Sequence, residues 1–297
     1  ILIRSRRREE AVRQALADLA AAAAADEDFA LPCFCRGSIH EAARDWSRAV
    51  DDFAAAVRRD PELGAAWFRL GYCRMEGLRE FETALGDFQR SIDLGCDVKT
   101  SHLNRGRIRQ QLGQHGEAIE EFDRALAVDP RYALALNVRG MSRESLGDRD
   151  GALADYTAAL AVAPKDVRTL TNLGLLRQAR GEFRQALDSL EAAVTADPAA
   201  HDAHAALGRL RATGREAAIR DGKEGVTHAT QACELSRWKD ADDLRTLACA
   251  LAENGEFGAA RTRLDEAIAL ATDVQRAEWQ PLREHFADGQ PWHDGGP

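Results

Sequence analysis

Proline, aromatic residues and lysine are all scarce in this chain. Only 8 of its 297 residues are proline, and Phe, Trp and Tyr together make up 6%. No stretch alternates apolar and polar residues as a half-buried β-strand does. The missing alternation argues against a β-sandwich or barrel, and the few prolines leave long stretches free to be helical. The chain is therefore predicted to be all-α.

The scarcity of lysine indicates the kind of organism that the chain comes from, and the charge and the lack of long apolar runs limit what it binds. Only 4 of the 40 basic residues are lysine, and this preference for arginine indicates a high-GC genome and hence a bacterial source. The net charge of −9 disfavours binding of nucleic acid along the whole chain. No apolar run is long enough to span a membrane and no signal peptide opens the sequence, so we expect no membrane contact within this chain.

Motifs for metal binding and catalysis are missing as well. The six cysteines form no CxxC pair and have no zinc-site spacing, which favours reduced, buried thiols and a cytoplasmic location. His201 and His204 are three residues apart, but no third ligand is spaced to join them, so we predict no metal ion and no cofactor. No P-loop, GxSxG, HExxH or kinase motif occurs, so we expect that the chain is not an enzyme.

What the sequence does have is a pattern of small, large and proline residues that repeats every 34 residues. Its members are Gly106, Gly140, Gly174 and Gly208; Ala118, Ala152 and Ala186; Phe122, Tyr156 and Leu190; Ala125, Ala159 and Ala193; and Pro130, Pro164 and Pro198. A glycine inside a helix is tolerable where a neighbouring helix must approach closely. Small and large residues alternate along one face of the helix that follows. A fixed period of this length predicts a helix–turn–helix repeat.

These positions resemble the tetratricopeptide repeat (TPR), in the form found in bacterial multi-repeat proteins. The resemblance covers roughly residues 9–272 and implies a right-handed superhelical solenoid of antiparallel helix pairs. Earlier units are indicated at Gly37 and Gly71, the second with one extra residue in its turn, so that Gly71 and Gly106 are 35 apart. We expect a partial N-terminal repeat over residues 1–29 and a TPR array of about seven helix pairs over 30–272.

Two segments near the end of the sequence depart from the period. The unit after Gly208 is five residues longer, and the additional residues fall in Thr213–Asp221. The DGK and WKD residues that follow resemble a run that precedes the last helix pair of many bacterial multi-repeat proteins, which implies a closing module. Trp279, Leu282 and Phe286 share one helix face, so we predict a capping helix over 273–288 and a flexible tail over 289–297.

Binding is the function that remains, because such arrays present surfaces that hold other molecules. In the TPR family the first helices of successive repeats line a concave groove. The resemblance therefore places ten residues in contact with a protein or peptide partner: Phe68, Arg69, Tyr72, Asn104, Arg107, Asn137, Met141, Arg168, Asn172 and Arg209. Asn104 and Asn172 have an alternative role in packing against the adjacent helix. Arginines bind carboxylates in bidentate fashion, so Arg107 and Arg168 favour an acidic partner.

Members of the family that bind chaperone tails use a clamp of Lys, Asn, Asn, Lys and Arg. The matching positions here read Leu103, Arg107, Val138, Arg168 and Asn172, so recognition of a chaperone tail is not expected. Our hypothesis is a non-catalytic protein- or peptide-binding scaffold. Because the sequence begins in mid-repeat and without Met, the alternative is a regulatory or substrate-docking C-terminal region of a larger bacterial enzyme, such as a Ser/Thr kinase. A sugar-transfer enzyme of the kind that carries such repeats is a third hypothesis.

Overall fold

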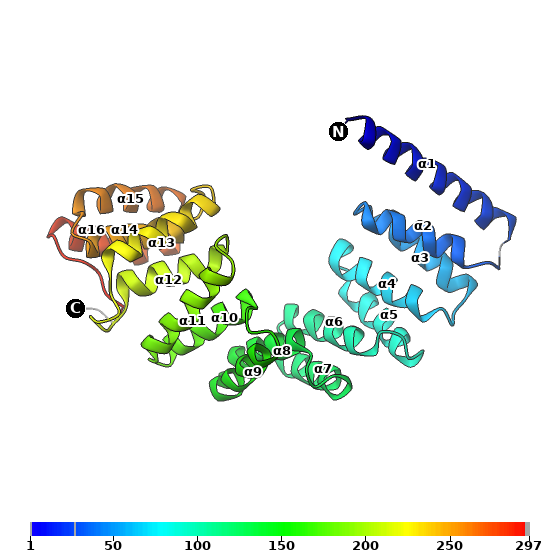
Figure 1. Cartoon of the computed structure of the whole chain (residues 1–297), viewed down its shortest axis with the longest axis horizontal. Helices are drawn as coiled ribbons and strands as arrows, with labels where there is room; N and C mark the ends of the chain where they lie inside the picture. Colours follow the sequence, from blue (N-terminus) through cyan, green and yellow to red (C-terminus); the bar gives the residue numbers. More distant parts are fainter. Residues whose placement is uncertain (1, 27, 295–297) are drawn as a thin grey trace. The chain divides into compact units, whose positions relative to one another are not determined.

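Helices make up all regular structure in residues 2–26 and 28–294, the part of the chain that the computed structural model describes (Figure 1). The chain divides into two compact units, Ile1–Asp148 and Arg149–Pro297. The prediction of an all-α repeat array is confirmed.

The first unit contains eight α-helices and one short π-helix in the described residues. They are α1 (Leu2–Ala25), α2 (Leu31–Ala42), α3 (Trp46–Arg59), α4 (Gly64–Cys73), η1 (Arg74–Leu78), α5 (Phe81–Asp93), α6 (Val98–Gln111), α7 (His115–Val128) and α8 (Ala133–Ser145). Three first helices, α2, α4 and α6, each pack against the second helix that follows them. The predicted partial repeat at the N-terminus is one helix, α1, and Arg59 Nη2 donates a hydrogen bond of 3.0 Å to the Ala23 carbonyl near its end.

The second unit contains the remaining helices. They are α9 (Arg149–Val162), α10 (Val167–Ala179), α11 (Phe183–Ala196), α12 (His201–Thr213), α13 (Gly222–Leu235), α14 (Ala241–Glu253), α15 (Phe257–Leu270) and α16 (Asp273–Ala287). Here α10, α12 and α14 are first helices, and each packs against its successor. The packed pairs are therefore α2–α3, α4–α5 and α6–α7 in the first unit and α10–α11, α12–α13 and α14–α15 in the second.

The periodic glycines lie where a first helix meets its second helix. A Cβ on Gly174 would lie 2.7 Å from the Leu190 side chain, and a Cβ on Gly208 would lie 2.8 Å from the backbone nitrogen of Ala229. Leu190 and Ala229 are both fully buried. The glycine therefore lets the two helices of a pair approach more closely than any other residue would allow, as the sequence predicts.

Two glycine-to-alanine substitutions test this packing. Gly208→Ala is expected to lower the free energy of unfolding by about 1–3 kcal/mol, because the new methyl group meets backbone atoms of Ala229 that cannot rotate away. Gly86 lies on the exposed side of α5, and a methyl group added there would meet nothing within 4 Å, so Gly86→Ala should stabilise by about 0.5–1 kcal/mol. Urea unfolding measures both, and equal effects of the two changes would contradict the assigned role of Gly208.

A buried acidic residue precedes the large apolar residue of several second helices, and sequence reasoning missed it. Asp52, Asp87 and Glu121 stand 35 and 34 residues apart, and each is at most 5% exposed. Basic side chains of the preceding first helices bind all three. The contacts run from Arg36 Nε to Asp52 (2.8 Å), from His40 Nδ1 to Asp52 (2.9 Å), from Arg74 Nη1 to both oxygens of Asp87 (2.9 and 2.7 Å), and from His102 Nδ1 (2.8 Å) and Arg105 Nη2 (3.0 Å) to Glu121.

At Asp87 the cost of burying the carboxylate and its attraction to the basic partner act in opposite directions. Burial raises the pKa of its carboxyl from 3.8 to about 6, although the Arg74 guanidinium acts in the opposite direction. The loss of water around the carboxylate therefore outweighs its attraction to Arg74. Asp155 keeps the acid in α9, whereas in α11 the same repeat position is a serine, and Arg177 Nη1 donates to Ser189 Oγ over 2.7 Å. A hydroxyl group there accepts the same kind of hydrogen bond without a buried charge.

The extra residue in the unit that starts near Gly71 does not lie in its turn. It is taken up by the π-helix η1, which continues α4 and ends at Arg79 in the left-handed region (φ 59°). A π-turn absorbs one inserted residue without breaking the helix, and such turns are frequent at functional sites. The insertion therefore changes the path of Glu76 and Gly77 instead of lengthening the loop.

The closing module contains helix caps as well as packing residues. In the DGK run, Asp221 caps α13 by accepting a hydrogen bond of 3.0 Å from the Glu224 backbone nitrogen. In the WKD run, Asp240 caps α14 in the same way, and the Arg263 guanidinium lies 4.9 Å from the Trp238 ring centre. These residues have structural roles, in agreement with the resemblance to a closing module.

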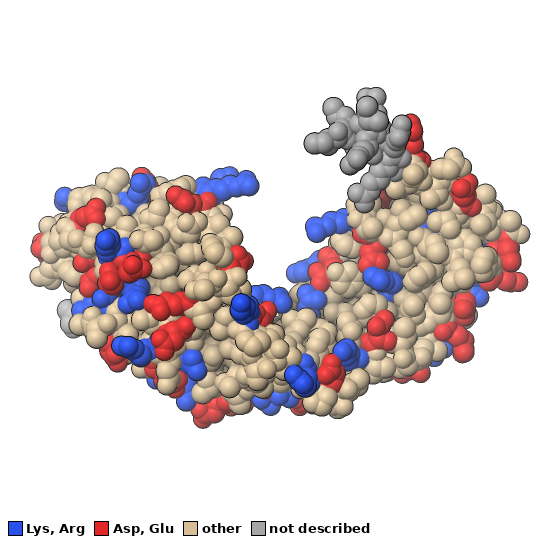
Figure 2. Space-filling view, in the orientation of Figure 1, with Lys and Arg blue, Asp and Glu red and all other residues tan. Residues whose placement is uncertain are grey.

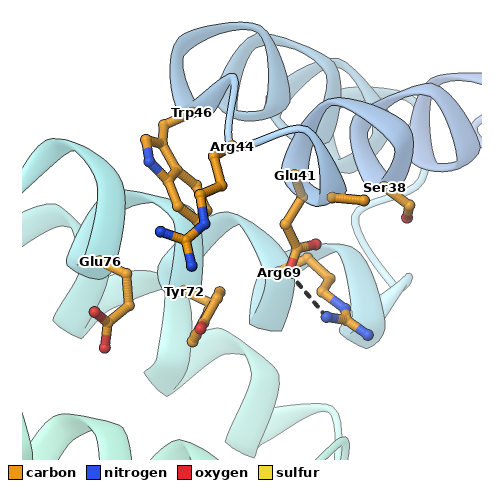
Figure 3. A pocket seen from close by; sticks show the side chains of 8 residues that line it. Ser38, Glu41, Arg44, Trp46, Arg69, Tyr72 and Glu76 are labelled. Carbon is orange, nitrogen blue, oxygen red and sulfur yellow. Dashed lines mark hydrogen bonds and ion pairs between the residues drawn. The ribbon is translucent and has the colours of Figure 1, made fainter. Parts of the chain in front are cut away.

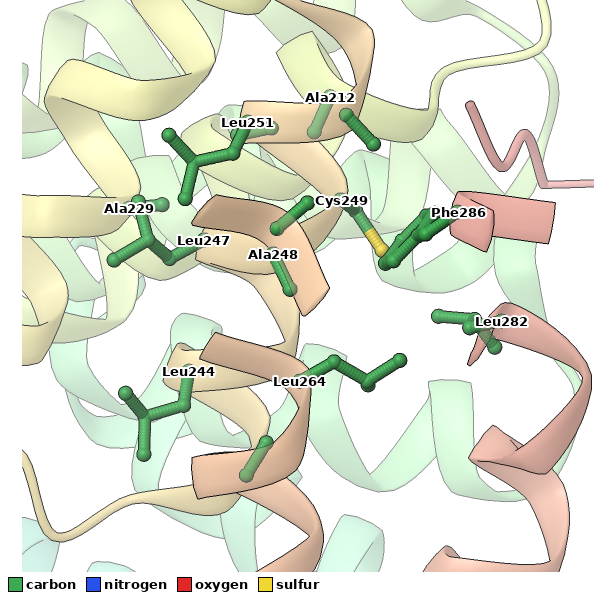
Figure 4. Packing of buried hydrophobic residues seen from close by; sticks show 14 of the residues in the cluster. Ala212, Ala229, Leu244, Leu247, Ala248, Cys249, Leu251, Leu264, Leu282 and Phe286 are labelled. Atoms are coloured by element: carbon green, nitrogen blue, oxygen red, sulfur yellow. The ribbon is translucent and has the colours of Figure 1, made fainter. Parts of the chain in front are cut away.

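Helix α16 spans most of the segment 273–288, for which a capping helix is expected. Thr272 caps it through a capping box with Gln275, and Trp279, Leu282 and Phe286 are buried against α14 and α15 (Figure 4). The helix covers the apolar side of the last pair, as a terminal repeat requires. In the segment predicted as a tail, residues 290–294 contact α12, α14 and α16, and residues 295–297 lie outside the described part of the chain.

Candidate partner-binding surface

A cavity of about 550 Å³ opens between α2 and α4 in the first unit (Figure 3). Residues from both first helices, from the turn after α2, from the start of α3 and from η1 line it: Ser38, Glu41, Ala42, Arg44, Trp46, Arg69, Tyr72 and Glu76. Two of these, Arg69 and Tyr72, are among the residues predicted to contact a partner. The cavity is large enough for one or two amino-acid side chains of a partner.

Trp46 and the π-helix form one wall of this cavity together. A Cβ on Gly77 would collide with the indole ring of Trp46, so the ring lies directly on the backbone of η1. Glu76, the residue before Gly77, lies at the edge of the cavity (Figure 3). The inserted residue of this repeat therefore helps to shape the cavity, and neither Trp46 nor Glu76 was predicted from the sequence.

Arg44 occupies a position that is glycine in later repeats. The turn residues Gly113, Gly147 and Gly181 have φ values of 74°, 82° and 80°, whereas Arg44 has φ 58° and Arg79, at the same place in the next repeat, has φ 59°. A side chain in this left-handed region costs about 1–2 kcal/mol. Arg44 follows Gly37 by seven residues, as Gly113 follows Gly106 and Gly181 follows Gly174, so this signal was available in the sequence.

The charges in and beside the cavity are mostly paired. Arg69 Nη1 lies 3.0 Å from Glu41 Oε1, and Arg107 Nη2 lies 2.8 Å from Glu76 Oε1. The expectation of a basic groove at Arg107 therefore needs correction, because a neighbouring carboxylate offsets that charge. Among the cavity residues, the Arg44 guanidinium has no hydrogen bond or ion pair with any described residue.

The remaining predicted residues of the first unit differ in accessibility. Phe68 is half-buried and meets the Phe88 ring edge-on at 5.8 Å, so much of its surface serves packing. Asn104 is 3% exposed and accepts a long hydrogen bond of 3.4 Å from Arg107 Nη1, which agrees with the packing alternative. On α8, Asn137 is buried and Met141 is 40% exposed.

Three predicted residues lie in the second unit. Arg168 is exposed at the start of α10, Asn172 is half-buried one turn later, and Arg209 lies on α12. Arg209 lines a second cavity of about 390 Å³, whose other lining residues are Leu175, Gln178, Ala179, Gly181, Phe183, Gly214, Arg215 and Asp294. The structure thus brings Arg209 together with the insertion and with the C-terminal segment.

The histidines and cysteines have ordinary structural surroundings. His204 Nε2 lies 3.1 Å from the Pro198 carbonyl, just as Trp67 Nε1 donates to the Pro61 carbonyl over 2.9 Å at the same repeat position. His201 instead bonds Asp243 (2.8 Å), and no group of three metal-ligating side chains occurs in the described residues. Burial raises the pKa of the Cys73 and Cys233 thiols to about 12, whereas Cys35 is exposed, contrary to the expectation of buried thiols throughout.

Basic and acidic side chains are intermixed on the visible face of the described residues. On the face seen in Figure 2, arginines and lysines lie among aspartates and glutamates over both units. None of the helices in the described residues is both long and apolar enough to cross a membrane. Recognition through this surface therefore depends on local pockets and single charges.

Comparison with known proteins agrees with the repeat geometry. The sequence profile of the tetratricopeptide repeat matches residues 36–95, 103–167 and 171–218, which together exceed half of the chain. The chain belongs to the tetratricopeptide repeat family. Superkiller complex protein 3 of Mus musculus is 34% identical over 103 residues, which are 34% of this chain and 6% of the relative. DnaJ homolog subfamily C member 7 of Homo sapiens is 29% identical over 100 residues, which are 34% of this chain and 20% of the relative.

Solved TPR structures share the fold at low sequence identity. The peptide-binding TPR protein YrrB has a TM-score of 0.51 and 19% identity, over 62% of this chain and 95% of its own. The Cut9–Hcn1 assembly has a TM-score of 0.64 and 19% identity, over 82% of this TPR chain and 46% of that one. A TPR protein of Cytophaga hutchinsonii reaches 0.63 at 15% identity, over 86% and 98% of the two chains. The family is one of protein-interaction scaffolds, and the matched part of the two curated relatives is a small share of their length.

Proposed function

We propose that this TPR chain is a non-catalytic scaffold that holds a protein partner on the first helices of its first unit, with the cavity between α2 and α4 as the anchor. The observation that carries the proposal is Arg44. Its backbone is held in a conformation that the family pattern fills with glycine, and its guanidinium points into the cavity without a carboxylate to bind among the described residues. Backbone strain of this kind concentrates at functional positions.

The side chains around Arg44 define the partner. Trp46 and Tyr72 offer aromatic surface, while Arg44 offers N–H donors to an acceptor from outside the cavity. An acidic side chain next to an apolar one in the partner would satisfy both. The acidic partner expected from the sequence is thus retained in the proposal, but Arg44 replaces Arg107 as its main contact.

The first test of the proposed site identifies the protein that binds at the cavity. A photo-crosslinking amino acid at Ser38, on the cavity wall, should capture a partner in cell extract that mass spectrometry identifies. The same amino acid at Glu82, exposed on the second helix α5, is the matched control and should not capture that protein. Capture of the same partner with equal yield from both positions would contradict the proposed site.

Arg44→Gly then separates binding from folding. Removing the guanidinium is expected to weaken binding of the partner about tenfold or more, since a hydrogen bond to a charged group contributes about 1.5–3 kcal/mol. The fold should be unchanged or stabilised by up to about 1 kcal/mol, because glycine relieves the left-handed strain. Arg79→Gly relieves the same strain outside the cavity and should bind normally. Unchanged affinity of Arg44→Gly would exclude Arg44 as the anchor.

A further inference from the structure

The C-terminal segment of the chain lies on the second unit as a short bound peptide would. After α16 the chain turns at Gly289 (φ 67°) and continues without helical structure through Gln290–Asp294. It reaches the ends of α12 and α14, which precede it by some 80 and 40 residues. The segment makes these contacts without being part of any repeat.

Three consecutive residues hold the segment. Trp292 packs beside the buried cluster of α14–α16 and meets the His285 ring edge-on at 5.0 Å. His293 Nε2 bonds Glu253 Oε2 at the end of α14 over 2.8 Å. The Asp294 backbone nitrogen donates to the Thr213 carbonyl (2.8 Å), and Thr213 Oγ1 donates to the Asp294 carboxylate (2.9 Å). An aromatic anchor followed two positions later by an acid is thus the pattern that this surface accepts.

The surface that receives the segment also has contacts of its own. Within the Thr213–Asp221 insertion, Ile219 is 2% exposed, and Arg211 Nη1 donates to its carbonyl over 3.1 Å. Arg220 donates to the Gly214 carbonyl (2.9 Å) and to Glu253 (3.0 Å), so the insertion is tied to α14. Contacts that order a surface before a ligand binds reduce the conformational entropy lost on binding.

The segment leaves part of this surface unused. Arg215 Nε donates to the Asp294 carbonyl over 3.0 Å, and the cavity of about 390 Å³ continues from there towards α10. Two buried polar atoms on its wall, Arg209 Nε and Gln178 Oε1, have no hydrogen-bond partner among the described residues. Buried polar atoms normally find a partner, so the cavity offers contacts that the chain's own segment does not make.

We propose that the insertion and the ends of α12 and α14 form a second binding site, which takes an extended protein segment with an aromatic residue two positions before an acidic one. Residues Trp292–Asp294 occupy this site within the chain until such a partner displaces them. A tethered segment competes at an effective concentration of roughly millimolar. A partner that keeps the same contacts and also reaches Arg209 and Gln178 gains the additional hydrogen bonds that allow displacement.

The experiment uses the full chain and a labelled peptide of residues 290–297 (QPWHDGGP) as the probe. In the double variant Trp292→Ala/Asp294→Ala the intramolecular segment loses its two anchors, so fluorescence anisotropy should show the peptide binding about tenfold or more tightly than to the unchanged chain. A peptide with the same two alanine changes should not bind. Adding Arg215→Ala to the double variant should weaken binding of the wild-type peptide. Adding Arg261→Ala should leave that binding unchanged, because Arg261 is exposed on α15.

A chain that ends at Gly289 gives an independent measurement. It should bind the peptide like the double variant, and circular dichroism establishes that it is folded. If the double variant loses its helical signal, the peptide affinity of the shortened chain tests the proposal. If the shortened chain loses its helical signal, the double variant tests it. The proposal would be overturned if the peptide bound the unchanged chain as tightly as the double variant or the shortened chain. It would also be overturned if either of these variants were folded and bound no peptide. The segment would then be a fixed part of the C-terminal cap.

Discussion

Replacing Arg74 by methionine is expected to lower the free energy of unfolding by about 3–5 kcal/mol at neutral pH, because the buried carboxylate of Asp87 loses the cation bound to it. Asp87 is 4% exposed, and Arg74 Nη1 binds both of its oxygens. Methionine keeps the length and apolar stem of the side chain, so packing changes little. Arg48→Met is the matched control, since the Arg48–Asp45 pair is exposed, and it should cost less than about 1 kcal/mol.

The pH dependence of Arg74→Met distinguishes the lost charge from a packing defect. The pKa of Asp87 is raised to about 6 in the folded chain, so the folded state favours the neutral acid. The stabilisation that comes from protonating Asp87 is present below about pH 4 and is lost as the pH rises through about 6. Without Arg74 this pKa rises further, and the variant should lose less stability at pH 5 than at pH 8.

Urea unfolding at both pH values measures this difference. Asp87→Asn, which cannot ionise, should remove the dependence between pH 4 and pH 6 and should lessen the effect of Arg74→Met in a double-mutant cycle. A loss that is the same at pH 5 and pH 8, or no larger than that of Arg48→Met, would show that the buried pair is not what Arg74 stabilises.

Replacing Phe286 by alanine is the second change with a large expected effect. Phe286 is 1% exposed and lies with Leu282 against Cys249 and Leu264, where α16 covers the last helix pair (Figure 4). Truncating a buried phenylalanine costs about 3–5 kcal/mol through lost burial and the cavity left behind. Because a repeat array depends on its end caps, the loss should begin in α14 and α15.

Hydrogen exchange resolves where that loss appears. Amides of α14 and α15 should exchange faster in Phe286→Ala, while those of the first unit should be unaffected, because each repeat is stabilised by its neighbours. Val274→Ala on the same helix is the control, since Val274 is 69% exposed. Uniform acceleration across both units, or an effect as small as that of the control, would contradict a local capping role.

The parts of the fold that the sequence predicted are those that repeat. Gly174 and Gly208 meet the next helix of their own pair, so their contacts follow from spacing within one repeat. The capping helix followed from the same logic, because three large apolar residues on one face need a surface to cover. Contacts between neighbours in sequence are thus readable from a period and from residue size.

The candidate sites depend on contacts that no period contains. Arg107 binds Glu76 across 31 residues, and Asp294 binds Thr213 across 81, so neither partner could be chosen from the sequence. Glu76 offsets the charge of Arg107, because charged side chains on adjacent helices form ion pairs when the helices pack. Arg44 is the exception, since its place in the glycine series distinguishes it in the sequence itself.

The left-handed turn residue also has an implication for how such an array changes its specificity. That position lies between two helices whose packing does not involve its side chain, so a codon change from glycine to arginine adds a charge to the neighbouring cleft at a cost of about 1–2 kcal/mol and leaves the core alone. In this chain the first two repeats carry arginine there, and Gly113, Gly147 and Gly181 show the unmodified form. Single substitutions at these inter-helix turns therefore change which ligands an array binds, while the sequence of every helix stays the same.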